Sequence, residues 1–153
     1  MMKRGILIAV VFGLFAGFAS AAADGNLTDN ILAMPLPRGW HGSVCFGQTS
    51  YGAAAYLFAG NFRFHASCHD AGPAVRRHKV LISIGDFPWR ARGRGPWPSV
   101  ERLRLPRKLK RDVSWQVRFH HRALYLSIEF GSRPTTRIRR IVNRRLASVR
   151  RLG

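Results

Sequence analysis

The chain has 153 residues, of which 26 are lysine or arginine and seven are acidic, so its formal net charge at pH 7 is +19. This length suits one domain with its own core, and such a charge favours contact with anionic polymers or membrane surfaces. The sequence has no Gly-x-Ser-x-Gly, no His-Glu-x-x-His and no phosphate-cradling glycine loop, so we expect a protein that is not an enzyme.

The first 23 residues have the three-part organisation of a secretory signal peptide. Lys3 and Arg4 form a positive start, residues 5–18 are apolar, and small residues ending at Ala23 offer cleavage sites. The apolar run of 14 residues is short for a bilayer span of about 20, so an uncleaved membrane anchor is the alternative. Cleavage removes 23 of the 153 residues and leaves 130. We therefore expect a secreted or cell-envelope protein.

Residues 24–35 are short and polar and predict a flexible mature N-terminus. A single α+β domain is expected over 36–153. Its first half contains short apolar runs between Gly and Pro turns, which are typical of strands. The strand candidates are 44–46, 53–58, 61–65 and 80–84. Residues 88–112 predict a long irregular segment rich in basic residues.

Two alternating apolar runs, 113–119 and 124–130, predict a β-hairpin, because side chains on a strand alternate between its faces. The residues between them contain no Asn-Gly or Asp-Gly, so the turn type stays open. From Thr136 the apolar period becomes that of a helix, which is predicted over 136–151 with Ser132 or Thr135 as its cap. Its arginines lie outside the apolar arc, except Arg145.

Several strands followed by a terminal helix predict an α+β fold. We expect an antiparallel sheet of about five strands with the C-terminal amphipathic helix packed on one face. The Pro-x-Gly-Trp motif at 37–40 and the helix end at 142–150 resemble small secreted actinobacterial proteins of unknown function. More loosely, they are similar to the PsbP-like α/β/α sandwich. This resemblance implies an antiparallel sheet flanked by helices, usually without catalysis. No cofactor is expected.

Cys45 and Cys68 are the two cysteines of the chain, and in an exported protein they predict a disulfide. Closing a loop of about 24 residues would stabilise the fold by roughly 3 kcal/mol in the chain-entropy model. A zinc site formed by His65, Cys68 and His69 with Cys45 is the alternative, because these residue types suit zinc. We expect the disulfide, and therefore no metal site.

The alternative function is that of a small exported hydrolase with a His/Asp site near residues 65–70. Such a site would recruit Ser67, His69 and Asp70, and a hydrolase could instead recruit His120 and His121. Neighbours in sequence seldom converge as nucleophile, base and orienting group, since catalytic triads assemble from distant segments. No catalytic residue is therefore predicted.

Residues 88–98 form the most distinctive loop, in which two tryptophans bracket three arginines on a Gly/Pro frame. Arginine pairs bidentately with phosphate, and tryptophan stacks on bases or sits in a lipid headgroup layer. The alternative is a solvated loop whose tryptophans pack onto the core. The predicted anionic-surface residues are Trp89, Arg90, Arg92, Arg94, Trp97, Arg140 and Arg144. The expected partner is an anionic polymer or membrane surface without nucleic-acid sequence specificity, and the oligomeric state stays open.

Overall fold

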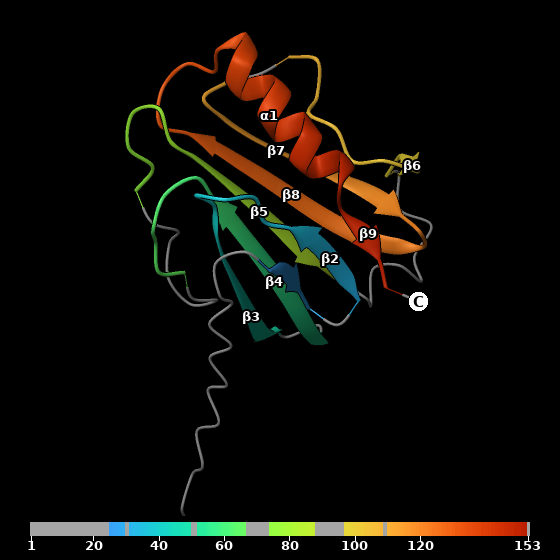
Figure 1. Cartoon of the computed structure of the whole chain (residues 1–153). Helices are drawn as coiled ribbons and strands as arrows, with labels where there is room; N and C mark the ends of the chain where they lie inside the picture. The colour runs from blue at the N-terminus through green and yellow to red at the C-terminus, as the bar shows by residue number, and fades with distance from the viewer. Residues whose placement is uncertain are drawn as a thin grey trace, which may run out of the picture.

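The computed structural model describes residues 25–29, 31–49, 52–66, 74–87, 97–108 and 110–152. Within these residues the chain forms a six-stranded sheet in the order β3-β4-β5-β8-β7-β6, a three-stranded sheet in the order β1-β2-β9, and one helix (Figure 1). The elements are β1 (Asn26–Thr28), β2 (Leu32–Pro35), β3 (His41–Thr49), β4 (Gly52–Gly60), β5 (Val80–Asp86), β6 (Ser99–Val100), β7 (Asp112–Phe119), β8 (Arg122–Phe130), α1 (Thr136–Ala147) and β9 (Arg150–Arg151).

The predicted hairpin at residues 113–130 is present as β7 and β8, and its turn is now defined. His120 and His121 connect the strands as a two-residue loop, with φ angles of 45° and 64°. Two residues in the left-handed region are the mark of a type I′ turn, which usually contains Asn-Gly. Histidine tolerates this region better than most side chains, but the conformation still costs free energy.

The core lies on one face of the six-stranded sheet. The strand register sets Ile84 of β5 between Leu57 of β4 and Leu126 of β8, and all three side chains are fully buried. Val142 and Leu146 of α1 pack into the same cluster, together with apolar residues of β1 and β2. Helix α1 and the small sheet therefore lie side by side over this face (Figure 1).

The α+β class is confirmed, but the prediction of about five antiparallel strands is wrong in detail. The large sheet has six strands and is mixed, since the two-residue strand β6 pairs in parallel with the end of β7. Such a short edge strand has no alternation that a sequence pattern could reveal. The second sheet was not expected, because one of its strands, β9, falls within the region predicted as helix.

The prediction of a flexible N-terminus over 24–35 is also wrong for the residues that form β1 and β2. Leu27, Leu32 and Met34 are completely buried against the large sheet. Gly42 of β3 leaves room for them, since a Cβ atom there would come within 2.9 Å of the Leu27 side chain. The burial of these apolar side chains, rather than local propensity, orders the segment.

Helix α1 begins as predicted, with Thr135 as its N-cap accepting a hydrogen bond from the Ile138 N–H at 3.3 Å. It ends at Ala147 and not at residue 151. Ser148 donates from both its N–H and its hydroxyl to the Arg145 carbonyl, and the chain then pairs with β2 as β9. No helix in the described part of the chain is long and apolar enough to cross a membrane. The predicted signal peptide lies outside the described residues.

Candidate anionic-surface site

The exposed side of α1 carries arginines and no acidic residue. Val142 and Leu146 face the core, so at about 100° per residue Arg140 and Arg144 lie on the opposite side of the helix. Both side chains are exposed, and neither has an ion-pair partner among the described residues. Four residues span about 6 Å along a helix axis, so these guanidinium groups form a row one turn apart.

A second basic segment, residues 101–108 and 110–111, lies along one flank of α1. The Leu105 N–H donates to the Asn143 side-chain oxygen at 2.8 Å, and Leu103 is buried in the core, which holds the segment against the helix. Its exposed cations are Arg102, Arg104, Arg107, Lys108, Lys110 and Arg111. We define the basic surface as Arg140 and Arg144 of α1 together with Arg104, Arg107 and Lys108 of this segment.

The carboxylates near α1 do not neutralise the basic surface. Asp29 and Asp86 are buried, at 3% and 0% exposure. Asp112 and Glu129 are partners across β7 and β8, on the sheet face away from α1, because the neighbouring Ile128 points into the core. Partial burial, with the charge of Asp112 beside it, raises the pKa of Glu129. Glu101 is exposed at the start of the basic segment, but the six exposed basic residues of that segment outnumber it, so the field over α1 stays positive.

A buried ion pair closes the other end of the core and is a structural feature, not part of the basic surface. Arg122 donates to both carboxylate oxygens of Asp86, with a shortest distance of 2.7 Å. Burial raises the pKa of Asp86, the Arg122 guanidinium opposes this, and the charge of Asp29 adds to the rise. Asp29 itself accepts hydrogen bonds from the Ile31 and Leu32 N–H groups, which shape the turn between β1 and β2.

Of the predicted surface residues, Arg140 and Arg144 are exposed on α1 as expected. Trp97 is partly buried, just before the Pro98 carbonyl that accepts the Arg118 N–H at 2.9 Å. Phe87, at the other flank of the loop, donates its N–H to the start of β8. The remaining predicted residues lie outside the described part of the chain; they are Trp89, Arg90, Arg92 and Arg94.

The cysteine and histidine predictions are only partly covered by the structure. Cys45 in β3 is the cysteine that the structure describes, and it is not free. Cys68 lies outside the described residues. Their pairing therefore stays a prediction. His65 is exposed, and residues 67–70 of the alternative hydrolase and zinc sites also lie outside the described ranges. Among the residues that are described, no three His, Cys, Asp or Glu side chains gather in a group suited to a metal ion.

Comparison with protein-family models, with curated proteins and with solved structures finds no match for this chain. The resemblance to secreted actinobacterial proteins and to the PsbP-like sandwich therefore stays a prediction. The chemistry that the described residues do offer is a row of exposed arginines on a helix anchored in the core. A second basic segment lies beside it. Asp29 and Asp86 are buried, Asp112 and Glu129 lie on the opposite face of the sheet, and Glu101 is an exposed carboxylate within that segment.

Proposed function

We propose that this is a secreted, non-enzymatic cell-envelope or extracellular protein that binds anionic polymers or anionic membrane surfaces through its basic surface. The observation that carries the proposal is the row of Arg140 and Arg144, exposed and without carboxylate partners on a helix free of acidic residues. Arginine forks pair bidentately with phosphate and carboxylate groups. Like charges four residues apart repel each other on a helix, and a bound polyanion relieves that repulsion.

The arrangement favours an extended ligand over a single small anion at this surface. The 12 residues of α1 extend over about 18 Å, and the basic segment follows its flank. A chain of phosphates, sulfates or carboxylates contacts several of these cations at once and releases the counterions that each had held. The predicted secretion signal makes polymers and lipids of the envelope or the extracellular space the accessible partners.

The experiment measures binding of the mature chain, starting at Asp24, to heparin and to vesicles with and without an anionic lipid. The double variant Arg140→Gln/Arg144→Gln is compared with Arg38→Gln/Arg63→Gln, which removes the same charge from two exposed positions outside the basic surface. We expect about tenfold weaker binding for the first pair, since each exposed ion pair contributes about 0.7 kcal/mol.

The control pair separates a defined surface from net charge. Equal losses in both double variants would show that only total charge matters, and no binding to either probe at low salt would refute the proposal. Binding to heparin but not to anionic vesicles assigns the surface to polymers. The reverse result assigns it to membranes.

A further inference from the structure

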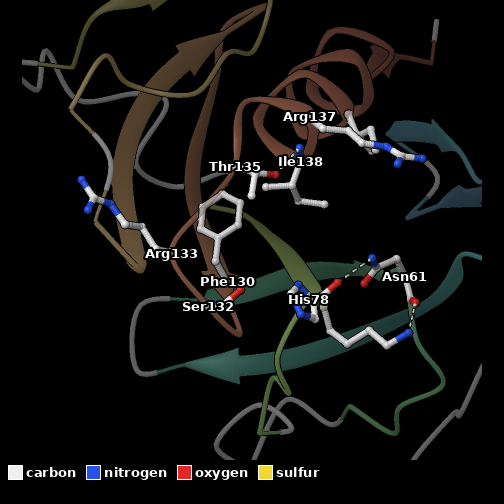
Figure 2. Close-up of a pocket in the computed structure, with 10 residues that line it drawn as sticks. Asn61, His78, Phe130, Ser132, Arg133, Thr135, Arg137 and Ile138 are labelled. Carbon is white, nitrogen blue, oxygen red and sulfur yellow. Dashed lines mark hydrogen bonds between the residues drawn. The ribbon is translucent and has the colours of Figure 1, made fainter.

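A cavity of about 330 Å³ opens at the beginning of α1, on the flank of the helix that faces away from the basic segment. It lies where the helix passes over the end of β8 and the connection between β4 and β5. Figure 2 shows Arg133 and Arg137 on opposite sides of this cavity, with Phe130 and Ile138 between them. Its size is at the lower end of small-molecule binding pockets.

The polar part of the lining is positively charged. Lys79, Arg133 and Arg137 are lining residues, and no lining residue is acidic. Figure 2 shows that the guanidinium group of Arg133 points away from the cavity. The Lys79 amine has only a long contact, 3.4 Å, to the Asn61 carbonyl, and the two arginine side chains have no partner among the described residues. The first-turn N–H groups of α1 add the positive end of the helix dipole, so Arg137 lies where a cation is unfavourable and an anion is favourable.

The rest of the lining is apolar. Phe130 is 1% exposed and forms part of the core, while Ile138 and Ile141 of α1 are partly buried. A small inorganic ion would not use this surface, because it gains nothing from apolar contact. An anion that carries an apolar group would bury part of that group here and gain about 25 cal/mol for each Å² removed from water.

The walls of the cavity are held in place by backbone contacts. The Asn61 side chain accepts the Val80 N–H at 2.9 Å. It also donates to the His78 carbonyl at 3.4 Å (Figure 2). The Gly131 N–H donates to the Lys79 carbonyl at 3.0 Å, which joins the end of β8 to the start of β5. The cavity is therefore formed before any ligand arrives, which lowers the entropic cost of binding.

We propose that this cavity binds a small amphiphilic anion. Its phosphate or carboxylate group contacts Lys79 and Arg137, and its apolar group lies on Ile138 and Ile141. The cavity lining shares no residue with the basic surface, so binding in the cavity can be tested independently of polymer binding. The ligand chemistry is shared by short soluble organic anions and by the phosphate of a single lipid molecule, and the experiment distinguishes these two sources.

Isothermal titration calorimetry of the mature chain at constant ionic strength compares benzyl phosphate with inorganic phosphate and with benzyl alcohol. Benzyl phosphate is expected to bind at least about tenfold more tightly than either, because it alone uses both parts of the lining. Lys79→Gln and Arg137→Gln each weaken benzyl phosphate binding about tenfold, as expected for a lost charge-assisted hydrogen bond. The matched control Arg38→Gln, at an exposed position outside both the cavity lining and the basic surface, changes it by less than about twofold.

Two results would overturn the proposal: equal affinity for benzyl phosphate and inorganic phosphate, or an equal effect of Arg38→Gln and Arg137→Gln. Arg137 and Lys79 are both exposed, so both variants should keep the fold. An unchanged thermal unfolding midpoint checks this. Monomeric dihexanoyl phosphatidate is the lipid probe. Tighter binding of this probe than of benzyl phosphate supports a lipid ligand, and the opposite order supports a soluble organic anion.

Discussion

Replacing Arg122 with methionine should destabilise the fold strongly and in a pH-dependent way. The substitution removes three hydrogen bonds to Asp86, two from Nε at 3.0 and 3.1 Å and one from Nη2 at 2.7 Å. The Asp86 side chain is 1% exposed, so its carboxylate stays buried without a partner. Breaking a buried pair costs about 3–5 kcal/mol. Because the Arg122 side chain is 20% exposed and water can partly replace it, we expect a loss of about 3 kcal/mol at pH 7.

The loss should shrink as the pH falls. Burial raises the pKa of Asp86 already in the parent protein, and the Arg122 guanidinium opposes this rise. Without Arg122 the folded-state pKa rises further above the unfolded value, so the folded protein binds the proton more tightly than the unfolded chain does. Folding stability then decreases as the pH rises through the interval between these two pKa values. Lowering the pH toward about 5 therefore recovers stability in the variant relative to the parent.

Urea unfolding at pH 7 and at about pH 5 measures both effects. A shift of the urea midpoint at an unchanged m-value reports the change in stability. The control is Asp86→Asn/Arg122→Met, which leaves no buried charge and should be more stable than the single variant at pH 7. A loss below about 1 kcal/mol for Arg122→Met, or the same loss at both pH values, would refute the account of this ion pair.

Three further outcomes test the fold. His121→Gly should stabilise the protein by about 1 kcal/mol in thermal unfolding, because it relieves a left-handed residue in the turn; destabilisation would contradict the turn assignment. Gly131→Ala should cost about 2 kcal/mol or more in urea unfolding, since its Cβ would overlap the Arg76 carbonyl oxygen, and a neutral effect would mean that this contact is absent. If Cys45 and Cys68 are bridged, thiol titration of the unreduced protein finds no free thiol and reduction lowers stability by roughly 3 kcal/mol, whereas two free thiols would rule the bridge out.

The elements with a regular apolar period were predictable from the sequence. The alternation over 113–119 and 124–130 places β7 and β8 within two residues of their observed bounds, and the helical period locates the start of α1 at Thr136. The alternation works because each of these strands buries one face only. The apolar run at 80–84 likewise marks β5, although the strand continues to Asp86.

The parts that were missed depend on contacts between distant segments. Strands β1 and β2 are too short to show a period, and they are ordered by burial against the large sheet. The Asp86–Arg122 pair joins residues 36 positions apart, and the only signal in the sequence was an acidic residue ending an apolar strand. The cavity draws on the start of β5, the end of β8 and the first turn of α1, so no local motif could have announced it.

The helix part of the basic surface could be predicted from the sequence. The exposure of Arg140 and Arg144 follows from the apolar arc on the other side of the helix, and the structure confirms it. The placement of residues 101–108 beside α1 required the contact between Leu105 and Asn143. This contact turns two separate runs of basic residues into neighbours on one side of the molecule.

The most direct test of the central claim is the salt dependence of polyanion binding, measured with a mixed-sequence DNA duplex as the probe. The logarithm of the affinity should fall linearly with the logarithm of the salt concentration, because each phosphate contact releases about one counterion. Arg140→Gln/Arg144→Gln should make this slope shallower by about two, and Arg38→Gln/Arg63→Gln should leave it unchanged. An unchanged slope in the first double variant would show that these arginines do not contact the polyanion.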